Sequence, residues 1–305
     1  MDEALWGIDL GGTKIEGAVL RSVEDAAPLC RLRLPTEAAQ GYEHILDQIR
    51  LLVSLMKKET GLSPERIGMG TPGILDPRMQ VMKNSNTTAL IGRPLKKDLE
   101  ERMGCGMTLA NDANCFALAE TRYGSIPEQC PGAKVVFGII MGTGVGGGIV
   151  VNGNVWNGIH GIAGEWGHNV LIENGEPCYC GKMGCVETVI SGPATEKFYA
   201  SLAGRQLPLA TIAGNAAKGD LIAVQTIDRL CYYFGKAVSV VVNILDPDVI
   251  VIGGGVGNIG ALYSRGVESL QAHIFSNMLA TPVLRPKLGD SAGVIGAAAL
   301  VAGNS

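Results

Sequence analysis

Three cysteines within eight residues form the densest group of metal-binding side chains in the chain. Cys178, Cys180 and Cys185 have the spacing C-x-C-x4-C, and His168 lies ten residues before the first of them. Three thiolates and one imidazole make a closed tetrahedral set for Zn²⁺, of the kind found in structural sites. A redox pair favours the spacing C-x-x-C, which this sequence lacks. The pattern therefore predicts a structural zinc site.

Glycine-rich turns suggest a place for phosphates. The segment DLGGTK, residues 9–14, puts Asp9 at the end of an expected strand, beside a turn with almost no side chains. Backbone N–H groups in such a turn can approach phosphate oxygens, and Asp9 could hold a bridging Mg²⁺. A hairpin turn with a polar tip is the plainer interpretation of this segment taken alone.

A second turn changes the balance between those interpretations. GTGVGGG, residues 142–148, contains G-x-G-x-x-G spacing but leads into an apolar strand, whereas a dinucleotide-binding fingerprint leads into a helix. Two hairpins of this kind suit a nucleotide held between two lobes. A third cluster, Gly253–Gly255, follows an expected strand and could pack against a flat base.

Polar residues also crowd the junction NDAN, residues 111–114, where a strand is expected to become a helix. A carboxylate at this place could take a proton from a substrate hydroxyl. Asn and Asp are equally good helix N-caps. From the residues alone, Asp112 is either a general base or a cap.

The elements that must position these groups alternate between strands and helices, which is the α/β pattern. The expected bounds of these strands and helices follow from the glycine turns, from the spacing of apolar residues and from proline and glycine at helix ends. Strands are expected at 4–10, 14–20, near 29–34, at 66–71, within 135–151 and before Gly253, and helices at 42–58, 94–104 and 292–302.

The composition is that of a globular protein. The 305 residues are 47% apolar and 18% charged, and the net charge of −4 provides no basic footprint for nucleic acid. The start has neither the basic region nor the apolar run of a signal peptide, and glycines or charges interrupt the later apolar stretches. We therefore expect a cytoplasmic protein without nucleic-acid or membrane partners, in which structural disulfides are rare.

Taken in order, these motifs resemble one known family. DLGGTK, TPG, NDAN, GTGVGGG, EWGH and CYCGKMGCVE look like the ROK family of sugar kinases and repressors. The similarity covers essentially the whole chain. Longer phrases, such as NSNTTALIGRPLKKDLEERM and PCYCGKMGCVETVISG, resemble the bacterial fructokinases and mannokinases of that family.

The resemblance implies a role for each matching residue. Asp112 would be the general base. The sugar would be held by Gly73, Asn86, Asn111, Asp112, Glu165, His168 and Glu187. ATP and Mg²⁺ would be held by Asp9, Gly11, Gly12, Thr13, Lys14, Thr143, Gly144, Gly254 and Gly255. Zinc would be bound by His168, Cys178, Cys180 and Cys185. Ala89 stands where family members often carry a tryptophan, which leaves the identity of the sugar open.

The resemblance also implies an actin-like, hexokinase-type α/β fold with two lobes and a structural zinc site. Residues 1–112 and 292–305 would form the small lobe, and 113–291 the large lobe with the zinc motif. The expected reaction is ATP-dependent phosphorylation of a hexose at its 6-hydroxyl, with fructose favoured. Glucokinase and N-acetylhexosamine kinase are the alternatives, and a homodimer is the expected assembly.

Two other classes are disfavoured. The sugar-responsive repressors of this family carry an added N-terminal helix-turn-helix, and a first phosphate turn at Gly11 leaves no room for one. A zinc-ribbon interaction module would need a second cysteine pair and leaves the glycine turns unexplained.

Overall fold

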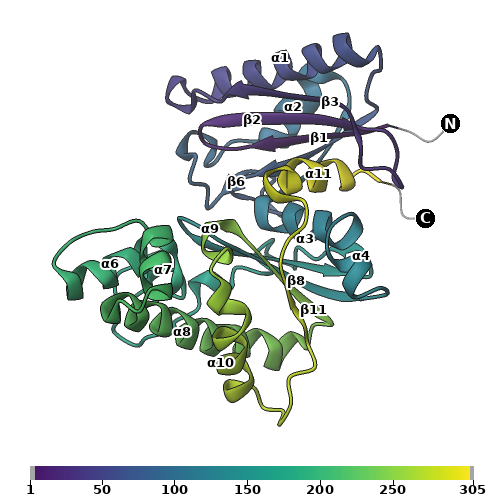
Figure 1. The fold of residues 1–305 in the computed structure, drawn as a ribbon. Helices are drawn as coiled ribbons and strands as arrows, with labels where there is room; N and C mark the ends of the chain where they lie inside the picture. Colours follow the sequence, from purple (N-terminus) through teal and green to yellow (C-terminus); the bar gives the residue numbers. More distant parts are fainter. Residues whose placement is uncertain (1–3, 303–305) are drawn as a thin grey trace. The chain divides into compact units, whose positions relative to one another are not determined.

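The chain divides into two compact units (Figure 1). The computed structural model describes residues 4–302. The first unit contains the described residues up to Pro127, together with 148–163 and the residues from Lys287 on, and the second contains 128–147 and 164–286. The lobe boundaries expected from the sequence stay a prediction, because compactness alone does not locate a hinge.

The first unit is built on a five-stranded sheet with the order β3-β2-β1-β4-β7. Its strands are β1 (Leu5–Leu10), β2 (Lys14–Leu20), β3 (Pro28–Pro35), β4 (Arg66–Thr71) and β7 (Gly106–Asn111). The first three are antiparallel neighbours, whereas β4 pairs parallel to both β1 and β7. The ends of β1, β4 and β7 therefore meet at one edge, which gathers Asp9, Thr71 and Asn111 there.

Helices cover both faces of this sheet. Helices α1 (Tyr42–Thr60) and α2 (Leu95–Met103) share one apolar core with the strands. Each ends at a left-handed glycine, Gly61 or Gly104, and the sequence predicts the second of these ends. Helices α3 (Asp112–Arg122) and α11 (Ala292–Ala299) pack on the other side. The hairpin of β5 (Ile74–Leu75) and β6 (Met82–Lys83) also belongs to this unit.

Helix α11 lies directly on bare backbone. A Cβ at Gly68 of β4 would collide with the carbonyl of Ala297, and one at Gly296 would collide with the carbonyl of Cys115 in α3. Glycine is therefore needed at both contacts, because a side chain at Gly68 would push α11 off the sheet and one at Gly296 would push it away from α3.

The second sheet has the order β10-β9-β8-β11-β12. Its strands are β8 (Val135–Met141), β9 (Val145–Val151), β10 (Asn154–Val155), β11 (Val249–Gly253) and β12 (Val283–Leu284). Strand β11 is parallel to β8 and β12, and β9 begins in the second unit and ends in the first. Strands β8 and β9 flank the second glycine turn, as expected.

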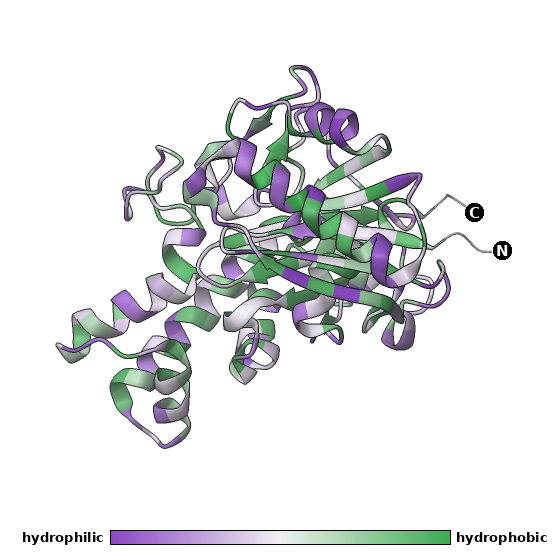
Figure 2. Ribbon diagram, turned by 90° about the horizontal axis from the view of Figure 1, so that it is seen from above, coloured by the Kyte–Doolittle hydropathy of each residue, from purple (hydrophilic) through white to green (hydrophobic). Residues whose placement is uncertain are grey.

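The remaining helices belong almost entirely to the second unit. They are α4 (Ile126–Gln129), α5 (Glu187–Ile190), α6 (Gly192–Ala203), α7 (Leu209–Ala217), α8 (Leu221–Leu245), α9 (Gly254–Gly257) and α10 (Arg265–His273). Figure 2 shows hydrophobic and hydrophilic residues mixed along the helices, as packing with one face toward a core requires. Within residues 4–302, no helix combines the length and apolar character needed to cross a membrane.

Candidate active site

The first glycine turn joins β1 to β2. The N–H of Gly11 donates to the carbonyl of Lys14 at 2.9 Å, which closes the turn. A Cβ at Gly11 would lie 2.9 Å from that same oxygen, so this position requires glycine. Gly12 and Thr13 are exposed. The turn therefore presents accessible backbone with few side-chain atoms, which is the arrangement expected for binding phosphate.

Thr36, which sequence reasoning missed, fixes the backbone of this turn. Its hydroxyl donates to the carbonyl of Gly11 at 2.6 Å, and its N–H donates to the carbonyl of Thr13 at 3.0 Å. The C=O and N–H of a trans peptide unit point in opposite directions, so holding the Gly11 carbonyl also sets the direction of the Gly12 N–H. The turn is thus oriented before any ligand binds.

Two carboxyl groups of the first unit influence each other electrostatically. Burial, together with the nearby charges of Asp112 and Glu16, raises the pKa of Asp9 to about 6, against the opposing effect of Lys14. Nearby carboxylates repel each other when both are ionised, and a bound cation stabilises their ionised forms. The donor set at Asp9 therefore fits the expected Mg²⁺.

At the strand-to-helix junction, Asn111 is the N-cap of α3. Its side chain accepts the N–H of Asn114 at 2.7 Å, whereas Asp112 is the first residue of α3 and accepts the N–H of Ala113 at 2.7 Å. Asp112 is exposed, yet the surrounding protein desolvates its carboxylate and raises its pKa. Asn111 therefore caps the helix in place of Asp112, and the Asp112 carboxylate is available to accept a proton.

The sugar-binding residues expected in the first unit gather at the ends of β4 and β7. The Thr71 hydroxyl lies within hydrogen-bond distance of the carbonyls of Gly73, at 2.9 Å, and Ala110, at 3.2 Å, and shares its single proton where the two strand ends meet. The N–H of Asn86 donates to the carbonyl of Pro72 at 3.3 Å, which brings the Asn86 loop to the same edge. Gly73, Asn86, Asn111 and Asp112 are thus brought together, as the sequence motifs predict.

The other expected residues lie in the second unit, around the second glycine turn. The Gly142 N–H donates to the Gly144 carbonyl at 2.9 Å, and Glu187, at the start of α5, accepts the N–H of Val145 at 3.0 Å. Glu165 directly precedes the short 3-10 turn Trp166–His168. Glu187 therefore supports the turn itself, a contact that the expected sugar-binding role did not include.

A cavity of about 830 Å³ lies within the second unit. Its lining is mostly apolar or glycine: Gly142, Thr143, Gly192, Pro193, Glu196, Pro208, Leu209, Ala210, Ala213, Gly255, Val256, Asn258 and Ile259. This size and character suit a drug-sized ligand with a flat base. Of the residues expected to hold the nucleotide, Thr143 and Gly255 line it, whereas Gly254 adopts a left-handed conformation (φ 81°) beside it.

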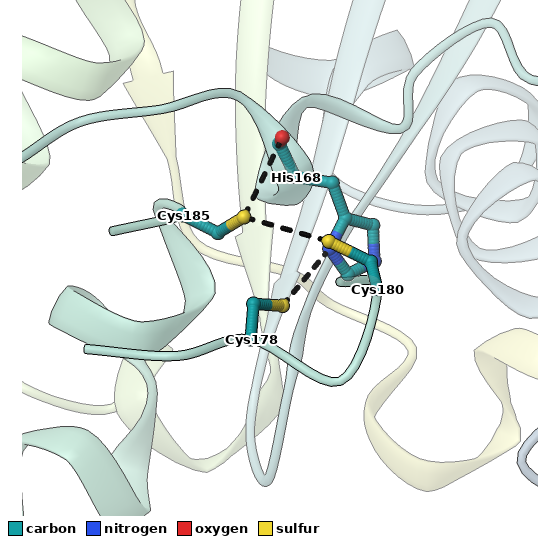
Figure 3. A group of neighbouring side chains, drawn as sticks. All are labelled: His168, Cys178, Cys180 and Cys185. Carbon is teal, nitrogen blue, oxygen red and sulfur yellow. Dashed lines mark hydrogen bonds between the residues drawn. The ribbon is translucent and has the colours of Figure 1, made fainter. Parts of the chain in front are cut away.

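The predicted zinc ligands converge, and Figure 3 shows their side chains pointing toward one another. One ligand atom from each of His168, Cys178, Cys180 and Cys185 lies within 4.8 Å of all the others. The Cys178 sulfur is 3.5 Å from His168 Nδ1, and the Cys180 and Cys185 sulfurs are 3.6 Å apart. The left-handed Gly181 and Gly184 turn the chain between the ligands.

Chemistry at this cluster fits a cation. Burial, together with the neighbouring Cys180 and Cys178, raises the pKa of the Cys185 thiol to about 12. A bound Zn²⁺ would remove that penalty. His168 would coordinate through Nδ1, since its Nε2 lies 3.0 Å from the hydroxyl of Tyr179. Metal-binding histidines usually engage the outer ring nitrogen in this way, and sequence reasoning did not identify Tyr179.

Comparisons with known proteins place the chain among its relatives. A family model described as "ROK family" matches residues 5–304. The chain belongs to the ROK family. N-acetyl-D-glucosamine kinase of Aliivibrio fischeri (strain ATCC 700601 / ES114) is 35% identical over 306 residues, which cover 97% of this chain and 98% of that protein.

Solved structures of this family share the architecture. The ROK hexokinase from Thermus thermophilus superposes with a TM-score of 0.86 at 32% identity, covering 98% of this chain and 97% of that one. A ROK family glucokinase from Streptomyces griseus, in complex with glucose and AMPPNP, gives 0.78 at 29% identity, covering 98% and 99%. The family expected from the motifs is confirmed, and so is the two-sheet, actin-like α/β fold.

Proposed function

We propose that this sugar kinase of the ROK family transfers the terminal phosphate of ATP to N-acetyl-D-glucosamine. The similarity to N-acetyl-D-glucosamine kinase along 97% of the chain carries the proposal. This similarity favours an N-acetylhexosamine over fructose as the substrate. The phrases that suggested fructose contain Asn86, the three zinc-ligand cysteines and Glu187, and nothing in them identifies the substituent at carbon 2 of the sugar.

A smaller cavity supports an acetamido substituent. It measures about 290 Å³, lies within the first unit and includes Asn111 in its lining. Asn114 and Asn157 contribute amide groups, and Ile74 and Leu75 contribute apolar surface. An acetamido group needs polar partners for its amide and an apolar place for its methyl, and this lining contains both amide side chains and apolar surface.

The proposed mechanism assigns proton transfer to Asp112. Its carboxylate accepts the proton of the sugar 6-hydroxyl as that oxygen attacks the terminal phosphorus of ATP and the bond to the leaving ADP oxygen breaks. Desolvation raises the pKa of Asp112, and a higher pKa makes its carboxylate a stronger proton acceptor. Asn111 holds the start of α3 and so fixes the direction of this carboxylate.

Phosphate binding is assigned to the first glycine turn. Backbone N–H groups at Gly12 and Thr13 would donate to phosphate oxygens, in an orientation that Thr36 sets in advance. Asp9 would hold Mg²⁺, which when bound neutralises charge on the phosphates. The 830 Å³ cavity would receive the nucleoside. Zinc on His168 and the three cysteines would shape the loop between Glu165 and Glu187 and take no part in proton transfer.

A panel of sugars tests the proposal. With ATP and Mg²⁺ saturating, kcat/KM should be at least about tenfold higher for N-acetyl-D-glucosamine than for glucose, mannose or fructose, a difference of about 1.4 kcal/mol in transition-state binding. The control is N-acetylmannosamine, which has the same substituent with the opposite configuration at carbon 2. A higher kcat/KM for fructose than for either N-acetylated sugar would refute the proposal.

A further inference from the structure

Thr87 carries a buried hydroxyl that the protein itself does not use. The residue is 5% exposed, and its Oγ1 has no hydrogen-bond partner in the part of the chain that the structure describes. Its backbone groups are both satisfied, because the N–H donates to Ser85 Oγ at 3.1 Å and the carbonyl accepts the N–H of Leu90 at 3.0 Å. Among the polar groups of Thr87, the side-chain hydroxyl is therefore the one without a hydrogen-bond partner in the described residues.

Local structure does not explain this hydroxyl. Thr87 precedes the 3-10 turn Thr88–Leu90, where a threonine side chain commonly caps, yet it makes no capping hydrogen bond. Leaving a hydroxyl buried without a partner costs on the order of 1–3 kcal/mol. An unsatisfied polar group of this kind in a native structure calls for a functional explanation.

The hydroxyl lies against the phosphate turn. A side chain at Gly12 would begin 3.6 Å from Thr87 Oγ1, and no other atom would come as close to it. The preceding residue, Asn86, is anchored to Pro72 at the end of β4. Thr87 therefore stands between the exposed backbone of Gly12 and the residues expected to hold the sugar.

We propose that Thr87 donates its hydroxyl hydrogen bond to an oxygen of the terminal phosphoryl group of ATP. Phosphate oxygens are acceptors, and the unpartnered hydroxyl is a donor placed beside the turn where those oxygens would lie. The inference rests on the proposed function. It deepens that function by adding a side-chain contact to the phosphate-binding backbone and by explaining why a threonine is buried at this position.

Thr87→Val tests the inference, because valine keeps the shape and removes only the hydroxyl. Hydrogen bonds to charged groups are the stronger ones, so kcat/KM for ATP should fall about 10- to 100-fold, and the Kd for the non-hydrolysable analogue AMPPNP should rise by about tenfold. The melting temperature should stay the same or rise, since an unsatisfied buried group has been removed. The Kd for the sugar should not change.

Two further variants complete the test. Thr87→Ser keeps the hydroxyl and should retain kcat/KM for ATP within about threefold. Thr88→Val is the matched control, because Thr88 is the exposed neighbour, and it should behave as wild type. Thr87→Val with unchanged kcat/KM and unchanged AMPPNP affinity would overturn the inference, as would a lower melting temperature accompanied by weaker sugar binding. Failure of the wild-type protein on N-acetylated sugars would instead count against the proposed function, because AMPPNP binding is measured in the absence of sugar.

Discussion

Asp112→Asn separates catalysis from helix capping at the NDAN junction. The change keeps the size of the side chain and removes its ability to accept a proton. Because the N-cap bond belongs to Asn111, at 2.7 Å from the Asn114 N–H, the substitution leaves the cap in place. A loss of activity could then be attributed to the carboxylate itself.

The expected effect on stability is small, because two contributions oppose each other. Removing a negative charge from the first turn of α3 costs about 0.3–1 kcal/mol. The same change removes a desolvated carboxylate that also raises the pKa of Asp9, which offsets part of that cost. A net change below about 1 kcal/mol corresponds to a shift of the melting temperature of at most about 2–4 °C. Asn111→Ala should be more destabilising, by about 1 kcal/mol, because it removes the cap.

The expected effect on catalysis is large. General-base catalysis contributes about 10²–10⁴-fold, so kcat should fall by that factor, or about 2.7–5.4 kcal/mol of transition-state stabilisation. Coupled detection of ADP at saturating substrates measures kcat, and calorimetry measures the sugar Kd and the melting temperature. Retention of more than roughly a tenth of wild-type kcat would refute the assignment of Asp112 as the base.

Three other perturbations follow from the same site. Cys180→Ser should abolish tight zinc binding and lower the melting temperature; purified wild-type protein that is folded and active yet free of zinc by elemental analysis would contradict this. The pKa of Asp9, raised to about 6, means that the folded protein without ligands binds more protons than the unfolded chain between about pH 4 and 6. The free energy of unfolding should therefore fall as pH rises through that window, by up to about 3 kcal/mol from Asp9. Asp9→Asn should remove this part of the pH dependence, and equal pH dependence in both proteins would count against the role of Asp9. Thr36→Val should raise KM for ATP several-fold and destabilise the protein by about 1 kcal/mol, with Thr36→Ser near wild type, because only the valine variant loses the bond to the Gly11 carbonyl; an unchanged KM for ATP would show that the turn needs no such support.

Local signals in the sequence were enough to predict the parts of the site that lie close together along the chain. The spacing of the four zinc-ligand candidates, the glycine turn after β1 and the junction at Asn111 each occupy a few residues. Backbone geometry then leaves few choices: Gly11 is required by the nearby Lys14 carbonyl, and Asn111 caps α3. These elements formed where they were expected because local chemistry determines them.

Residues that act across long sequence separations could not be found in that way. Thr36 contacts a turn 25 residues earlier in the chain, and Thr87 faces Gly12 across 75 residues. A lone threonine carries no motif, and its role becomes visible only when its donors and acceptors are counted in the folded protein. The helices from α6 to α8 had a detectable signal in their apolar spacing, but no functional motif drew attention to them.

The position of α11 also has a consequence for the order in which the protein can form during synthesis. Residues 292–299 close the face of the sheet that carries Asp9, yet they lie about 180 residues after Asp112. A ribosome adding about 5–20 residues per second needs roughly 9–36 seconds to cover that distance. During this interval the backbone of Gly68 is not yet covered by α11. The second unit ends at Pro286, before α11 begins, so the phosphate turn and the base gain the support of α11 only after residues 292–299 have been synthesised.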